Sequence, residues 1–213
     1  MPDSDPRTRR QELENFVAGR VVRIQRAYLE SSRPDGAAAL AELRRSGTEP
    51  GSSPTTWTLE FEDFPETLVG STHEPSRGER AAHLAFTLYA IHQQSQTEPM
   101  HKPGLEHSLG RAVHRLGVDR RQSSDTTVLG QPPTRFAALG TASTFEEVGH
   151  YARQLVTQLR AAGIALDYGR LAGQLYELLN PWRADAVRLQ WGREFAGAST
   201  LSTDTSTSDQ KED

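Results

Sequence analysis

Residues 105–136 read LEHSLGRAVHRLGVDRRQSSDTTVLGQPPTRF, and the rest of the chain is arranged around them. At the 3.6-residue period of an α-helix, the apolar and basic residues of the first half separate onto opposite faces. The apolar face consists of Leu105, Leu109, Ala112, Val113 and Leu116, and the basic face of His107, Arg111, His114 and Arg115. The pattern predicts an amphipathic helix with an exposed basic side, then a proline-containing loop, then a further helix from Arg135.

This basic stretch has an excess of positive charge. Residues 102–136 hold six cations, Lys102, Arg111, Arg115, Arg120, Arg121 and Arg135, against three acids, Glu106, Asp119 and Asp125. Arg111 has no acidic residue three or four positions away, and Arg115 has only Asp119, so both side chains are expected to be available to an external anion. Arginine makes bidentate contacts with phosphate. The stretch is therefore a candidate phosphate-binding surface.

Charge is unevenly distributed along the 213 residues. The net charge is −4, but residues 49–79 alone carry −6 and residues 198–213 carry −3, so the remainder of the chain is basic. There is no cysteine and no apolar run near the roughly 20 residues that cross a bilayer. We therefore expect a cytoplasmic protein without a membrane segment, in which the acidic appendages accompany a mildly basic body.

Helical periodicity and capping signals predict an all-α protein of about eight helices. The expected helices cover residues 11–31, 34–46, 75–94, 105–118, 132–139, 144–162, 167–179 and 181–197. Thr144 and Glu147 form a capping box, Asp167 caps the next helix, and Gly47 and Gly163 end helices. We interpret the chain as two small bundles, residues 10–118 and 130–197, with disordered termini before about residue 10 and over 198–213.

The acidic connector, residues 49–79, contains TWTLEFEDF at 56–64, and this stretch is interpreted as an extended or short helical connector. The connector's carboxylates Glu60, Glu62, Asp63 and Glu66 are expected to be solvated and are disfavoured as a metal site. No histidine pair has the i,i+4 spacing of a zinc helix, and HExxH, GxxxxGK[ST] and GxSxG motifs are absent. We expect no enzyme activity, metal or cofactor. Arg20 falls on the apolar side of its helix and is interpreted as an internal ion-pair or packing residue.

Five short motifs occur in one order along the chain. They are LRR at 43–45, SLGRA at 108–112, RFAAL at 135–139, FEEVGHYARQLVTQLRAAGIALDYGRLAGQLYEL from 145, and WGREF at 191–195. Together they resemble the CasB family, the small subunit of the type I-E CRISPR surveillance complex Cascade, over about residues 16–196. Two departures from the family pattern are the long, proline-rich link 117–135 and Gln174, where the family often has an acid.

The resemblance implies a non-catalytic, two-bundle helical protein with nucleic-acid and protein partners. Such subunits occur as two copies in Cascade, contact other Cascade subunits and the crRNA, and stabilise the target and displaced DNA strands in antiviral defence. By motif position, Arg44, Arg45, Arg111 and Arg135 inherit the nucleic-acid contacts, and the helix-face argument adds Arg115 and Arg121. Two alternatives remain: a helical adaptor that binds only proteins, and, less favoured, a metal-dependent nuclease that uses the acidic connector.

Overall fold

The computed structural model describes residues 6–30, 34–47, 50–51, 53–71, 73–122 and 134–207, with side chains for 8–30, 35–47, 50–51, 53–71, 73–117 and 134–197. Nine α-helices and two 3₁₀ helices occur in this part of the chain. They are α1 (Pro6–Leu29), α2 (Pro34–Arg45), α3 (Pro54–Phe61), η1 (Glu66–Leu68), α4 (Arg77–Gln93), η2 (Leu105–His107), α5 (Leu109–Gln122), α6 (Thr134–Thr141), α7 (Phe145–Ala161), α8 (Tyr168–Leu178) and α9 (Ala184–Thr207). The described backbone has no strand, only an isolated parallel bridge between His101 and Leu166. The predicted all-α class is confirmed.

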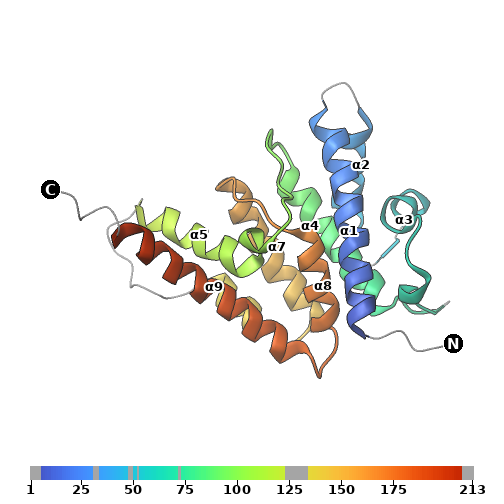
Figure 1. Ribbon diagram of the computed structural model, residues 1–213. Coiled ribbons are helices and arrows are strands. Elements are labelled where there is room, and N and C mark those ends of the chain that lie inside the picture. The colour runs from blue at the N-terminus through green and yellow to red at the C-terminus, as the bar shows by residue number, and fades with distance from the viewer. Residues whose placement is uncertain are drawn as a thin grey trace.

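Helix α4 lies at the centre of the molecule. It packs against α1, α2, α3, α7 and α8, and nearly all its side chains are buried. In Figure 1, α1 and α2 stand side by side, α5 and α9 run together on the opposite side, and α7 and α8 lie between these pairs. Buried side chains from both halves of the chain form one contiguous core. The division into two bundles stays a prediction.

Local signals set several helix ends as expected. In the capping box of α7, the Thr144 Oγ1 accepts a hydrogen bond from the Glu147 amide at 3.1 Å, and the Glu147 carboxylate accepts one from the Thr144 amide at 3.3 Å. At the start of α8, Asp167 Oδ1 accepts from the Arg170 amide at 3.0 Å. Gly163 adopts φ +65° directly after α7, a conformation that glycine reaches without a Cβ penalty.

The segment that leads into α5 is fixed by backbone hydrogen bonds to the segment before α8. The Leu166 amide donates to the Met100 carbonyl at 3.0 Å, and the Asp167 amide donates to the His107 carbonyl at 2.8 Å. Asp167 Oδ2 also accepts from the Gly104 amide at 2.8 Å. The start of α5 is thereby held in register with the start of α8, although the two lie some sixty residues apart.

Several predicted elements differ from the structure. The first helix, expected from residue 11, begins at Pro6 as α1, and the last, expected over residues 181–197, spans Ala184–Thr207 as α9, so part of each terminus expected to be disordered is helical. The helix expected from Leu105 begins only at Leu109, because residues 105–107 form the separate turn η2, and Leu105 is 45% exposed. The acidic connector contains the helix α3, and its Glu60 is fully buried, so the expectation that this carboxylate is solvated is wrong. Glu60 is buried because His83 on α4 supplies a partner, with His83 Nδ1 2.9 Å from Glu60 Oε1.

Candidate nucleic-acid interface

Helix α5, which carries Arg111 and Arg115, packs closely on α9 through a glycine. A methyl carbon added at Gly110 would lie 2.5 Å from the Trp191 carbonyl oxygen and 2.7 Å from the Phe195 nitrogen. Trp191 is itself buried, and its indole N–H donates to Gln174 Oε1 on α8 at 2.9 Å. The SLGRA and WGREF segments, more than eighty residues apart, therefore meet at one helix contact, and this contact fixes the position of the α5 arginines.

Arg111 has a partner that helix spacing did not reveal. Its guanidinium forms an ion pair with Glu106, five residues earlier in η2. The expectation that Arg111 has no acidic partner is therefore wrong, because the turn before the helix brings Glu106 back onto its face. The Glu106 side chain is 70% exposed and that of Arg111 only 16%. An ion pair with such an exposed carboxylate contributes little stability and can exchange for another anion.

The histidines of the predicted basic face do not add exposed charge. His114 is 6% exposed and packs against the Phe195 ring, with centroids 5.6 Å apart, so its predicted exposure is wrong: α9 covers a second side of α5. Burial lowers the pKa of His107, and the nearby charges of Arg115 and Lys102 lower it further. His107 is thus neutral near pH 7, and the charge of this cluster comes from Lys102, Arg111 and Arg115.

A part-buried ion pair between α8 and α9 supports the α5–α9 contact. Arg170 Nη2 donates to Glu194 Oε1 at 2.6 Å, and Gln190 Nε2 donates to the same oxygen at 2.9 Å. Glu194 is 8% exposed, so its charge requires these partners. The pair joins α8 to α9 next to Gly110. Because Arg170 is paired with Glu194, its charge is already compensated within the protein.

Two predicted arginines lie at the end of α2. Arg44 is half-buried and its Nη1 donates to the Ala90 carbonyl of α4 at 3.4 Å. Arg45 is 70% exposed and contacts Glu42 at 3.0 Å. The hydrogen bonds of Arg45, Thr56 and Ser53 hold the pKa of Glu42 below its ordinary value. Arg45 is therefore exposed but paired with an ionised carboxylate, whereas Arg44 is oriented by a neutral carbonyl.

Arg135 lies on α6, where it is positioned by α7. Its Nε donates to Gln154 Oε1 at 2.7 Å, and Gln154 in turn lies 2.6 Å from His150. Gln154 is neutral, so the hydrogen bond orients the Arg135 guanidinium without neutralising its charge. The Arg121 side chain, like that of Arg120, lies outside the described residues.

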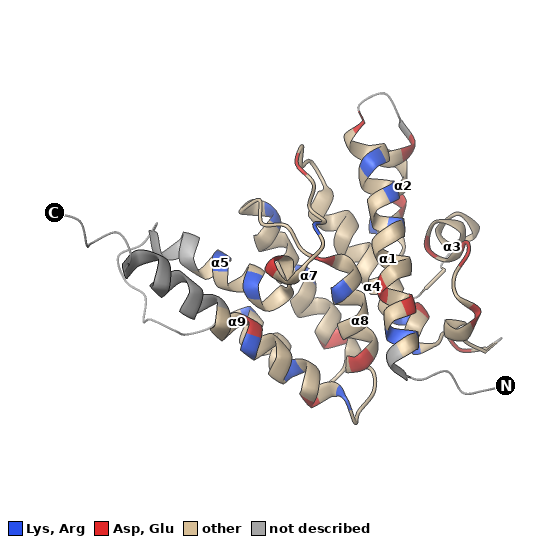
Figure 2. Cartoon of the chain, viewed as in Figure 1, with Lys and Arg blue, Asp and Glu red and all other residues tan. Residues whose placement is uncertain are grey.

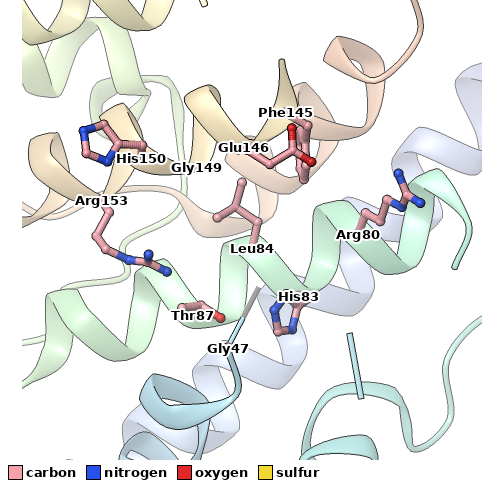
Figure 3. Close-up of a pocket in the computed structure, with 10 residues that line it drawn as sticks. All are labelled: Gly47, Arg80, His83, Leu84, Thr87, Phe145, Glu146, Gly149, His150 and Arg153. Atoms are coloured by element: carbon pink, nitrogen blue, oxygen red, sulfur yellow. The ribbon is translucent and has the colours of Figure 1, made fainter. Parts of the chain in front are cut away.

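A cavity of about 390 Å³ opens between α4 and α7, and we call it the α4–α7 pocket. It is lined by Gly47, Arg80, His83, Leu84, Thr87, Phe145, Glu146, Gly149, His150 and Arg153. Figure 3 shows Arg153 reaching from α7 towards Thr87 on α4, with Glu146 at the other end of the pocket. The end of α2 borders the pocket through Gly47, and His150 connects it to Gln154 and Arg135. The pocket thus lies between the predicted sites Arg45 and Arg135.

The predicted arginines therefore fall in two places. Arg111 and Arg115 lie on α5, beside α9, whereas Arg135 and the Arg44–Arg45 pair flank the α4–α7 pocket. Figure 2 shows blue segments on α5 and a separate group around α2; the blue segments on α9 are basic residues outside the predicted set. The predicted arginines thus come from three helices, α2, α5 and α6, as the expected helix boundaries implied.

Several exposed arginines were missed by the sequence analysis, among them one on α7 and one on α9. Arg153 on α7 and Arg193 on α9 have no side-chain hydrogen bond or ion pair among the residues with described side chains. Neither has an acidic residue three or four positions away in sequence. The test that was applied to Arg111 would have selected both if it had been applied to every arginine.

Metal and membrane chemistry find no support in the described part of the chain. No group of three potential ligands lies close enough to hold a metal ion there. None of the described helices combines the length and the apolar composition that a membrane span requires.

Arg20 is buried as predicted: it is 6% exposed, donates to the Glu62 carbonyl and lies over the Phe16 ring at 5.4 Å.

The fold and the surface define an all-helical protein that presents arginines on separate helices around one rigid core. The model of the family described as CRISPR-associated protein Cse2 matches residues 39–195. The chain belongs to this family, also called CasB. Membership of the family supports the assignment of the chain as a subunit of the CRISPR complex Cascade.

Two solved structures resemble this fold. The chain is 35% identical to CasB from Thermobifida fusca, with a TM-score of 0.69 over 86% of this chain and 97% of that one. It is 23% identical to M. ruber CasB, with a TM-score of 0.58 over 88% and 98% of the two chains, a similarity of fold. Comparison with curated protein sequences gave no match.

Proposed function

We propose that this protein is a non-catalytic Cascade subunit that holds nucleic-acid backbone through its surface arginines. It would contact other Cascade subunits, a second copy of itself, the crRNA and both strands of the target DNA, within the cytoplasm. The proposal rests on one observation, the match of the family model across most of the folded chain. The contacts assigned to individual arginines are part of the proposal.

The surface chemistry supports contact with phosphates more than reading of bases. Arg45 and Arg135 are exposed near the residues Gly47 and His150 that line the α4–α7 pocket, and the described partner of Arg111 is an exposed carboxylate. Among the exposed large apolar side chains, none lies on α6 or α7, where a stacking platform would accompany these arginines. Backbone contacts position a strand without selecting its sequence.

Such contacts can have a large effect in R-loop formation. The guide–target heteroduplex is about as stable as the DNA duplex that it replaces, so modest protein–backbone contacts can shift the balance. A protein that neutralises about four phosphates gives a log–log salt slope near −4. Binding by this subunit is therefore expected to be weak in isolation, independent of sequence and sensitive to salt.

The test is target binding by a reconstituted complex that contains an Arg111→Ala/Arg135→Ala subunit. Loss of two phosphate contacts should weaken binding and reduce the salt slope by about 2. Arg23→Ala/Arg26→Ala is a matched control, because it removes two exposed charges from α1 that are outside the predicted set. Circular dichroism establishes that each variant is folded. Unchanged affinity and slope, or equal losses in the control, would contradict the proposed contacts.

A protein-only adaptor is the second candidate, and one observation favours it. Trp182, just before α9, is 93% exposed, and Leu189, in the second turn of α9, is 54% exposed. Large exposed apolar side chains often mark protein contacts. This candidate predicts that Trp182→Ala weakens assembly of the complex while the arginine double variant leaves DNA binding unchanged.

A further inference from the structure

The α4–α7 pocket contains a buried histidine that is tied to a buried carboxylate. His83 is 4% exposed and Glu60 is completely buried. His83 Nδ1 lies 2.9 and 3.0 Å from the two carboxylate oxygens of Glu60, which comes from α3. The Gly51 amide donates to the same carboxylate at 3.3 Å. Glu60 thereby fixes the ring of His83 and requires Nδ1 to be the protonated nitrogen.

The other ring nitrogen of His83, Nε2, is buried without a hydrogen-bond partner among the described residues. A buried polar atom without a partner costs free energy unless something binds it. His83 lines the α4–α7 pocket, so its ring borders a molecule that occupies the pocket.

The charges that face His83 favour an anion in the pocket. Besides Glu60 on α3, they are Arg80 on α4 and Glu146 and Arg153 on α7, together with the titratable His150. Arg80 and Arg153 are exposed, and neither has a side-chain partner among the residues with described side chains. The negative charge of Glu60 compensates the positive charge of a protonated His83. Glu146 lies away from Arg153 in Figure 3. The end of the pocket near Arg153 therefore has uncompensated positive charge.

We propose that the α4–α7 pocket binds a phosphate group, which accepts hydrogen bonds from Arg153 and from the protonated ring of His83. A tetrahedral anion can accept from both donors, which come from facing helices. When His83 is neutral, Nε2 presents a lone pair that repels the anion; when it is protonated, Nε2–H donates. The proposed contact therefore requires the protonated form of the ring. The inference rests on the proposed function only for the source of the phosphate, a nucleic-acid strand or the free ion.

The experiment uses the full-length protein with ¹³C-labelled histidine and follows the His83 ring resonance by NMR. The probes are inorganic phosphate, a short single-stranded oligothymidylate and acetate, each at pH 6 and pH 8. His92 and His101 are internal controls, because both are buried outside the pocket. We expect phosphate to shift the His83 signal and leave the two controls in place, with tighter binding at pH 6 for the oligonucleotide, whose phosphodiester charge is constant.

Arg153→Gln tests the pocket without disturbing the core, because Arg153 is exposed. It should weaken phosphate binding by about tenfold or more, since it removes a charge-assisted hydrogen bond. Arg193→Gln is the matched control on α9 and should leave the affinity unchanged. His83→Gln should abolish the pH dependence, and its melting temperature shows whether the variant is folded.

The outcomes separate the possible ligands. Shifts with both phosphate and oligonucleotide, or with the oligonucleotide alone, support the pocket with backbone as its ligand. Shifts with phosphate alone support the pocket with the free ion as its ligand, and they count against the proposed function rather than against the pocket. No shift with either probe, or shifts that persist unchanged in Arg153→Gln, overturn the proposal. An equal shift with acetate also overturns it and points instead to a carboxylate of a protein partner.

Discussion

Substitution of Gly110 by alanine tests whether the α5–α9 contact holds the α5 arginines in place. The new Cβ would lie 2.5 Å from the Trp191 carbonyl oxygen, 2.6 Å from Glu194 Cβ and 2.7 Å from the Phe195 nitrogen. Two of these atoms belong to backbone, so the helices must separate by roughly 1 Å. A gap of that size forfeits about a quarter to a half of the dispersion attraction across the contact. Overpacking of this kind costs about 1–3 kcal/mol.

Gly192→Ala provides a matched control on the facing helix. A Cβ at Gly192 meets nothing within 4 Å, so this variant receives only the gain in helix propensity, about 1 kcal/mol. Both variants share that gain, and the difference between their unfolding free energies isolates the clash. The assay is thermal unfolding, in which about 1–3 kcal/mol lowers the melting temperature of Gly110→Ala by about 2–12 °C relative to Gly192→Ala. Equal melting temperatures would refute the close approach of α5 to α9.

Two further predictions concern stability. Thr144→Ala removes the side-chain acceptor at the start of α7 and should cost about 1 kcal/mol, measured by urea unfolding. Burial lowers the pKa of His92 to about 3, so between pH 3 and 6.5 the unfolded chain holds a proton that the folded chain does not. Stability should therefore fall as the pH falls, by about 2 kcal/mol between pH 6.5 and pH 5, and His92→Gln should reduce this loss. A flat pH profile would contradict the buried, neutral state of His92.

The helices that the sequence predicted well are those whose ends depend on nearby residues. The caps at Thr144 and Asp167 form with partners three residues away, and the stop at Gly163 needs only its own backbone angle. Arg20 was also assigned correctly, since its position on an apolar helix face implies burial whatever covers that face. In each case the deciding physics is local, or depends only on which side of one helix a residue occupies.

The candidate site was harder to predict because its partners come from elsewhere in the chain. Glu60 is buried against His83, which is twenty-three residues away, and no local pattern signals that pairing. His114 is buried because α9 packs on a side of α5 that periodicity assigns to solvent. Arg111 meets Glu106 because a 3₁₀ turn replaces the expected first turn of the helix. A helical projection describes one helix, whereas these contacts depend on its neighbours and its exact start.

The partners of each arginine indicate which contacts a phosphate can make most easily. At α5, a phosphate must displace Glu106 from Arg111, so part of the attraction is lost in breaking an existing pair. At α6 and α7, Arg135 is oriented by the neutral Gln154, and a phosphate meets its full charge. A neutral hydrogen bond that orients a guanidinium reduces the entropy lost on binding without competing for the ligand. On these grounds the region between Arg135 and the α4–α7 pocket should contribute more binding free energy than the α5 surface from which the prediction began.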